Sequence, residues 1–86
     1  MFKVLVHRKA RREIASLLDG DRIRLLTAIK EMGSDPFVGD VKPLRPVKGL
    51  FRRRVGEYRI IFTVNFESGE VVIFSVGRRE SVYEKI

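Results

Sequence analysis

The chain begins with an alternation of apolar and polar residues. Residues 2–7 carry this period of two, which is typical of a half-buried strand. From about Lys9 the period lengthens to that of a helix. The expected apolar face of this helix consists of Ala10, Ile14, Leu17 and Leu18. The pattern therefore predicts one strand followed directly by a helix.

A second helix is predicted after the sequence Asp19-Gly20-Asp21. Glycine suits the end of a helix and aspartate the N-cap of the next, so we expect the second helix to run from about Arg22 to Met32. Its expected buried face consists of Ile23, Leu26, Ile29 and Met32. Because the connection is so short, the two helices should pack side by side as a hairpin.

The segment 34–49 contains all three prolines and two glycines. Because these residues disfavour helices and strands, we expect no regular secondary structure there. We interpret it as a long structured loop. Its apolar residues Val38, Val41 and Leu44 are expected to anchor it to the core.

Three strands are predicted in the remainder, at residues 50–55, 58–65 and 71–77. Only Gly56-Glu57 separates the first two, and glycine first in a two-residue loop is typical of a tight hairpin. The order of elements predicts an α+β fold: an N-terminal strand, a helical hairpin and a three-stranded antiparallel meander, with the helices on one face of the sheet. We expect a single domain over residues 1–86.

The two-residue turn fixes the register of the predicted hairpin. It places Arg54 opposite Arg59, and it puts Arg52 on the same sheet face as both, because side chains alternate along a strand. The other face is mostly apolar and should lie under the helices. Arg53 is the exception on that face, and we expect it to leave the core at the sheet margin.

The pairing of the last strand stays open at this point. If Phe66 pairs with Val71, Arg78 joins the face of Arg59; if the loop is one residue shorter and followed by a bulge, Arg79 joins it instead. In both cases at least one more arginine comes close to the end of the hairpin.

The charge of the chain points to a polyanionic partner. Eighteen Lys and Arg residues against eleven Asp and Glu residues give a net charge of +7, and nucleic acid is the first candidate, although an anionic membrane surface or an acidic protein would use the same field. Guanidinium groups suit phosphate because they stay charged and offer a planar fork of donors. Apolar runs of at most four or five residues exclude a membrane-spanning helix.

The predicted helical hairpin carries its own basic residues. They are Arg8, Lys9, Arg11, Arg12, Arg22, Arg24 and Lys30. A solvated helix face is one interpretation, and non-specific contacts with RNA phosphates are the other.

Other chemistries have little support. The absence of cysteine excludes thiol chemistry and disulfides and fits a cytoplasmic protein. His7 is the only histidine, and we expect it to be solvated or to cap a helix. No cluster has metal-ligand spacing, so we expect no metal and no cofactor.

Taken together, these motifs resemble the RelE/ParE toxin superfamily, and the resemblance covers essentially the whole chain. The motifs that carry it are Arg52-x-Arg54, Val55-Gly56-Glu57-Tyr58-Arg59-Ile60-Ile61-Phe62, Val76-Gly77-Arg78-Arg79 and Tyr83, with Asp35-Pro36 and Lys42-Pro43-Leu44 before them. Members of the RelE branch are ribosome-dependent endoribonucleases that cleave mRNA in the ribosomal A site and are silenced by a cognate antitoxin. The resemblance implies the same activity here, with the ribosome, mRNA and an acidic antitoxin as partners.

The resemblance also implies the site residues. Arg52, Arg54, Arg59, Arg79 and Tyr83 match the catalytic positions. RNA-binding positions are expected at Arg78, Arg8, Lys9, Arg11 and Arg12. The chain departs from the family in two respects: it has arginines where many members have two lysines, and the spacing from the last-strand arginine to the C-terminal tyrosine is shorter than in some members.

RNA cleavage without a metal proceeds by attack of a ribose 2′-hydroxyl on the adjacent phosphorus. The arginines suit the task of stabilising the extra phosphorane charge, but arginine is a poor base with a pKa of about 12.5 or more. Tyr83 could act as a base only if nearby guanidinium groups lowered its pKa from about 10, and it could equally stack on a nucleobase.

Two other functions fit the same residues. A ParE-like toxin shares the fold but inhibits DNA gyrase, and it would trigger DNA damage rather than arrest translation. A non-catalytic RNA-binding module would need only the positive face, and it would bind RNA without cutting it.

Overall fold

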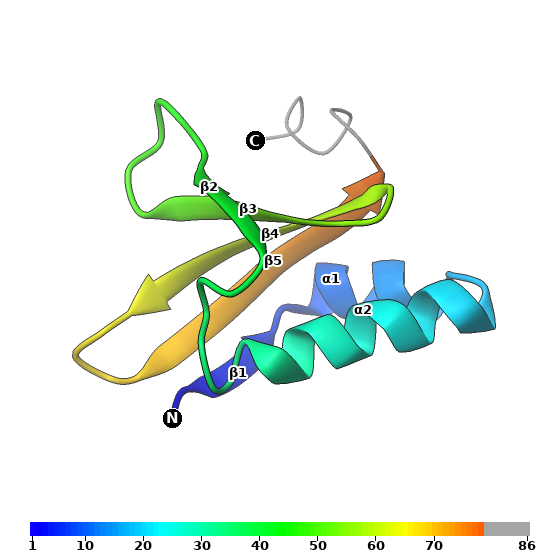
Figure 1. The fold of residues 1–86 in the computed structure, drawn as a ribbon, viewed down its shortest axis with the longest axis horizontal. Coiled ribbons are helices and arrows are strands. Elements are labelled where there is room, and N and C mark those ends of the chain that lie inside the picture. Colours follow the sequence, from blue (N-terminus) through cyan, green and yellow to red (C-terminus); the bar gives the residue numbers. More distant parts are fainter. Residues whose placement is uncertain (79–86) are drawn as a thin grey trace.

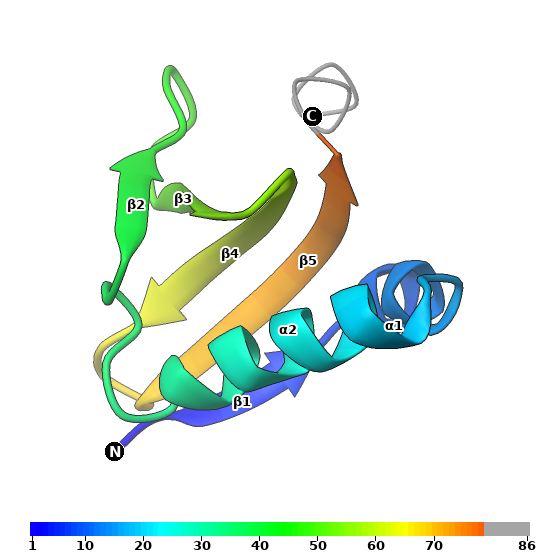
Figure 2. The same cartoon turned by 45° about the vertical axis from the view of Figure 1, so that its right-hand side comes forward.

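The computed structural model describes residues 1–78, which form one strand, then two helices, then four strands. In chain order they are β1 (Lys3–Val6), α1 (Arg8–Ala15), α2 (Asp19–Glu31), β2 (Asp40–Pro43), β3 (Leu50–Val55), β4 (Tyr58–Asn65) and β5 (Glu70–Arg78). The strands form one sheet in the order β1-β5-β4-β3-β2, in which β1 runs parallel to β5 and the other neighbours are antiparallel. Both helices lie on the same side of this sheet (Figures 1 and 2). The predicted α+β class and its helix-covered sheet are confirmed.

The core lies between α2 and the central strands β4 and β5. Its largest fully buried members on the sheet's inner face and on α2 are Phe62, Leu25, Met32, Ile60, Ile73 and Val71. Burying one such side chain contributes about 1.5–3 kcal/mol. These residues fix which face of each strand points inward, and therefore which residues are left for the outer face.

Residues 40–43 form a strand, so the prediction of a segment without regular structure is wrong there. β2 pairs with β3 from Asp40 opposite Arg54 to Pro43 opposite Phe51. Proline is tolerated because β2 is an edge strand, where a missing N–H breaks no ladder. Val41 packs against the core, as expected.

Helix α2 begins three residues earlier than the sequence predicted. Gly20 does not end a helix but lies in the first turn of α2, after Leu18 at the N-cap position. Asp19 and Asp21 also lie in this turn, where carboxylates are stabilised by the helix dipole. Asp19 forms an ion pair with Arg22 one turn later. The acidic residues therefore start α2 without requiring a break at Gly20.

The buried face of α2 differs from the predicted one. Leu25 and Ala28 are buried together with Ile29 and Met32, whereas Ile23 and Leu26 are 64% and 49% exposed. A step of three residues falls about 60° short of a full helical turn, so four residues at that spacing drift across the surface. The i, i+3, i+4, i+7 pattern from Leu25 stays on one side. Leu18, predicted for the core, is 80% exposed.

Helix α1 continues along the edge of β5 where β1 ends. The Glu13 carboxylate accepts hydrogen bonds from the Val76 N–H at 2.8 Å and from the Ser75 hydroxyl at 3.1 Å. An edge strand exposes backbone N–H groups that need partners. Glu13 supplies one and fixes α1 against the second half of β5.

Candidate nucleic-acid interface

The β3–β4 hairpin has the register that the sequence predicted. Gly56 takes a positive φ of 59° in the two-residue turn. Arg54 pairs with Arg59 and Arg52 with Ile61. Because Ile60 and its neighbours on the other face belong to the core, the three arginines lie on the sheet face that points away from the helices.

Strand β2 adds a fourth cation to this face. Lys42 is exposed and lies opposite Arg52, and Asp40 lies opposite Arg54. We call the set Lys42, Arg52, Arg54 and Arg59 the arginine face. Lys42 was not predicted as a site residue, because the segment was taken as a loop. The polar, apolar, polar order of residues 40–42 was the signal that could have placed it.

Arg52 and Arg54 differ in how far other residues compensate their charge. An Arg52 guanidinium nitrogen lies 3.4 Å from an Asp40 carboxylate oxygen, and the Arg52 side chain is 12% exposed. Arg54 is exposed and forms no ion pair with any of residues 1–78. Like charges on directly opposite residues destabilise a strand pair, so an anion placed between Arg54 and Arg59 would replace repulsion with attraction.

Arg53 lies in the protein interior, which corrects the prediction that it leaves the core at the sheet margin. Its side chain donates to the Ala28 carbonyl at 2.9 Å and to the Glu31 carboxylate at 2.7 Å. The residue is only 8% exposed. Gly39, with φ at 86°, leaves the space that Arg53 occupies, since a Cβ there would lie 3.1 Å from the guanidinium. Arg53 thus ties β3 to the C-terminal half of α2.

Tyr58 is an anchor on the opposite side of the hairpin from the arginine face. Its hydroxyl donates to the Asp21 carboxylate at 2.9 Å, and this hydrogen bond, with burial, raises the pKa of Tyr58 above its ordinary value. The Arg78 guanidinium lies 5.7 Å from the centre of its ring and pairs with Glu57 at 3.2 Å. Tyr58 therefore fixes the hairpin to the start of α2.

The register of β4 and β5 differs from both predicted pairings, because Gly77 lies opposite Arg59. Asn65 pairs with Glu70, the register shifts between Ile61 and Phe62, and Tyr58 pairs with Arg78. The pairing of Phe66 with Val71 is therefore wrong, and Arg78 lies on the side of Tyr58 rather than on the arginine face.

Two predicted catalytic residues, Arg79 and Tyr83, lie outside the described residues. Their roles stay predictions.

The predicted RNA-binding residues of the helical hairpin form a second basic surface. Arg8, Arg11 and Arg12 line an open pocket of about 480 Å³ along α1, and Lys9 is exposed beside them. His7 is the N-cap of α1, and its Nδ1 accepts a hydrogen bond from the Lys9 N–H at 3.1 Å. The capping role expected for His7 is thus confirmed.

Residues 1–78 contain no group of three or more His, Cys, Asp and Glu side chains that could hold a metal ion. Within the same range, no helix is long and apolar enough to cross a membrane.

The chain is similar to RelE proteins over nearly its whole length, although no family model matches it. The putative toxin RelE1 of Methanocaldococcus jannaschii is 22% identical in an alignment of length 86 that covers 96% of this chain and 96% of that protein. A chain in the crystal structure of the RelE–RelB complex from Pyrococcus horikoshii superposes on this chain with a TM-score of 0.81. The two are 25% identical, over 91% of this chain and 94% of that one.

A toxin–antitoxin complex from Mycobacterium tuberculosis, RelBE2, contains a similar chain, with a TM-score of 0.80 and 28% identity over 91% of this chain and 98% of that one. The high TM-scores over more than nine-tenths of this chain show that the fold is shared with both structures. Over nearly its whole length, the chain therefore resembles the RelE-like toxins of the RelE/ParE superfamily in sequence and in fold.

Proposed function

We propose that this chain is the toxin of a type II toxin–antitoxin system and acts as a ribosome-dependent endoribonuclease that cleaves mRNA in the A site. The observation that carries the proposal is the pairing of Arg54 with Arg59 on the outer sheet face, flanked by Arg52 and Lys42. Similarity to RelE proteins over nearly the whole chain supports it. A cytoplasmic location follows from these partners.

The proposed reaction is attack of a ribose 2′-hydroxyl on the neighbouring phosphorus, giving a cyclic phosphate and a 5′-hydroxyl. Arg54 and Arg59 would hold the non-bridging oxygens, where negative charge increases in the transition state. Arg52 and Lys42 would hold an adjacent phosphate. The guanidinium groups supply the positive charge that this step needs, so we propose a reaction that is independent of metal ions.

Proton transfer is assigned to groups beyond the arginine face. Tyr58 is unsuitable as a base because its pKa is raised and its hydroxyl is bonded to Asp21 under the helices. We propose Tyr83 for this role and Arg79 for charge stabilisation, on the resemblance alone. Weak acid–base groups leave much of the rate to in-line positioning of the RNA, which the ribosome would provide.

An acidic antitoxin is the proposed partner. The RelE chains of Pyrococcus horikoshii and Mycobacterium tuberculosis are seen in complexes with antitoxins. Carboxylates from such a protein would neutralise the arginine face and block access of RNA to it. We expect the chain to co-purify with a small acidic protein, in a complex without nuclease activity. A complex that keeps full activity would contradict this neutralisation.

The function is tested by comparing the purified protein on naked RNA and on programmed ribosomes. We expect cleavage only on the ribosome. Equal cutting of both substrates would disprove ribosome dependence. DNA damage without translation arrest would instead support the ParE-like function, and ribosome binding without cutting would support the binding module.

A further inference from the structure

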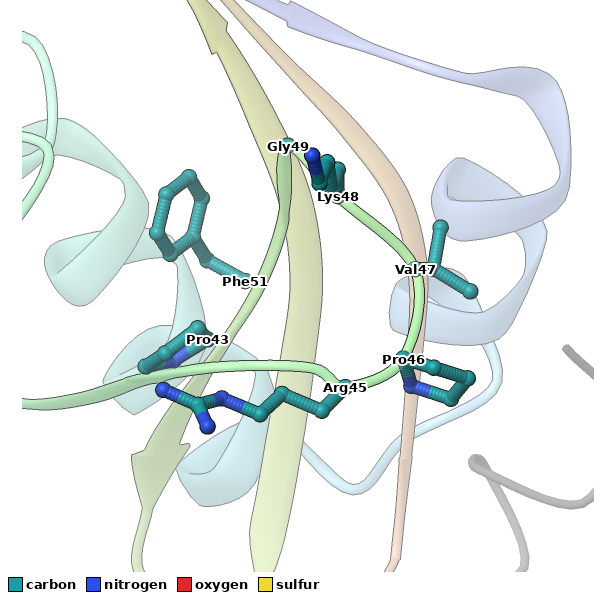
Figure 3. A pocket seen from close by; sticks show the side chains of 7 residues that line it. All are labelled: Pro43, Arg45, Pro46, Val47, Lys48, Gly49 and Phe51. Carbon is teal, nitrogen blue, oxygen red and sulfur yellow. The ribbon is translucent and has the colours of Figure 1, made fainter.

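The connection between β2 and β3 curves round an open pocket of about 400 Å³ that the proposed reaction does not use (Figure 3). This volume is within the roughly 300–1,000 Å³ typical of small-ligand sites. Its lining combines the apolar side chains of Pro43, Pro46, Val47 and Phe51 with the cations Arg45 and Lys48.

The pocket is held in shape by its own loop. The Leu44 N–H donates to the Leu50 carbonyl at 2.8 Å and closes the base of the loop, and Pro43 pairs with Phe51 across the strands. Gly49 makes the return turn with φ at 80°. A preorganised loop loses less conformational entropy when a ligand binds.

The wall formed by Phe51 is also fixed. Its ring packs edge-on against Phe37 at 5.1 Å between centroids and lies 5.7 Å from Phe62 of the core. The ring therefore presents a rigid apolar surface to the pocket, while Val47 is 45% exposed at the opposite side.

We propose that this pocket binds one unpaired nucleotide of the mRNA, next to the cleaved codon. A nucleotide offers both a flat base for the apolar lining and a phosphate for Arg45 and Lys48, as in other proteins that bind single-stranded RNA. An acidic peptide would use the two cations but leave the apolar lining without a matching group. The inference rests on the proposed function and extends it to substrate recognition.

The pocket lies at the end of the β2–β3 hairpin, next in sequence to two residues of the arginine face. Lys42 and Arg52 immediately adjoin Pro43 and Phe51 on β2 and β3. Phe51 is three residues from Arg54, or about 10 Å along the strand. Side chains of Phe51 and Arg52 point to opposite faces, so an RNA strand that leaves the arginine face reaches the pocket by turning over the end of the β2–β3 hairpin.

The test uses the purified protein and an uncleavable 2′-O-methyl single-stranded oligonucleotide, beside a matched oligonucleotide without bases. Arg45→Gln and Lys48→Gln should each lower the slope of log affinity against log salt by about 0.7, the value for one contact to a single strand. Val47→Glu should remove a base-dependent gain in affinity of roughly ten-fold. Phe51 is left unchanged because it supports the core.

Lys3→Gln is the matched control, since Lys3 is exposed on β1 at the other edge of the sheet. The proposal is overturned if the pocket variants bind both oligonucleotides as the Lys3→Gln variant does. On programmed ribosomes, 4-thiouridine placed in the mRNA should crosslink to residues 43–51. Cleavage of the mRNA without any crosslink to that segment would overturn the mRNA as the source of the nucleotide.

Failure of the pocket and failure of the proposed function are separable. If the parental protein cleaves mRNA and the pocket variants behave as the control, only the pocket assignment is wrong. If the parental protein does not cleave on ribosomes but Val47→Glu still removes base-dependent binding, the nucleotide site stands and the nuclease is disproved.

Discussion

At Arg54 and Arg59, two guanidinium groups occupy opposite positions one pair away from the hairpin turn. In such a hairpin the pair that closes the turn is hydrogen-bonded, so the next pair has its Cα atoms at about 4.5 Å and its side chains close together. Two unit charges 4 Å apart in water repel by about 1 kcal/mol. This local cost favours a site that is occupied by an anion during function.

We predict that Arg54→Ala and Arg59→Ala slow single-turnover mRNA cleavage at saturating ribosomes by roughly 10²–10³-fold, by analogy with the loss of one oxyanion donor. Arg11→Ala should instead weaken ribosome binding, mainly at higher salt, because it removes a phosphate contact outside the arginine face. If Arg54→Ala and Arg59→Ala both cleave at the parental rate once bound, these arginines only bind RNA and take no part in catalysis.

Tyr58→Phe tests the anchor between the hairpin and α2. The raised pKa of Tyr58 means that the folded protein favours the neutral phenol. Its contribution to stability should be full below a pH of about 10, the unperturbed value, and should be lost as the pH rises through the raised pKa. Urea unfolding over a pH series should show a less stable variant at neutral pH and a difference that shrinks above pH 10. A difference that is constant to high pH would contradict the assignment.

At the scale of elements, β3 carries alternating arginines with opposite functions. Arg52 and Arg54 face outward, whereas Arg53 between them is bonded to Ala28 and Glu31 of α2. The strand that presents the arginine face is therefore positioned by one of its own arginines.

Replacement of Arg53 by Met should lower the free energy of unfolding by about 1–3 kcal/mol, because two hydrogen bonds to α2 are lost, one of them to the Glu31 carboxylate. Arg54→Met is the neighbouring control on the exposed face and should not lower stability, because it removes the repulsion between Arg54 and Arg59. Chemical denaturation measures both. Similar midpoints for the two variants would show that Arg53 does not tie β3 to the helix.

Two adjacent leucines of helix α2 provide a second pair of variants, one in the core and one at the surface. Leu25→Ala should lower the free energy of unfolding by about 2–5 kcal/mol because it leaves a cavity in the core. Leu26→Ala should cost much less, since Leu26 is 49% exposed whereas Leu25 is fully buried. If thermal or urea unfolding showed a larger loss of stability for Leu26→Ala than for Leu25→Ala, the buried face predicted from the sequence would be the correct one.

The parts of this fold that depend on neighbouring residues in the sequence were predictable, and those that depend on tertiary structure were not. The Gly56-Glu57 turn sets the hairpin register, so the partners of Arg52, Arg54 and Arg59 followed from counting residues. Strand β2 could not be predicted from its prolines, because whether a proline is tolerated depends on lying at a sheet edge, which is a property of the tertiary structure.

Long-range partners account for the other differences. Arg53 is buried because a helix carbonyl and Glu31 happen to lie within reach, and no local pattern in β3 carries that information. The bulge between β4 and β5 is likewise a feature of strand pairing that no local pattern in β4 announces. The arginine face was largely predictable, and Lys42 was missed together with its strand.

For the whole molecule, the two basic surfaces have different positions and different proposed functions. The arginine face lies on the outer side of the sheet, and Arg8, Arg11 and Arg12 lie along α1 in the helical layer. A net charge of +7 would draw the protein to ribosomal RNA in general. On the outer face, Arg54 and Arg59 lie on directly opposite residues of two strands, which suits joint binding of one phosphate.

The most direct test of the central claim maps the 5′ ends of an mRNA during translation in vitro, with the parental protein, with Arg54→Ala and without either. The account predicts new 5′ ends within the codon in the A site, strongly reduced with Arg54→Ala and absent from the same mRNA without ribosomes. New ends at the same positions in ribosome-free mRNA, or no new ends while translation continues, would contradict it.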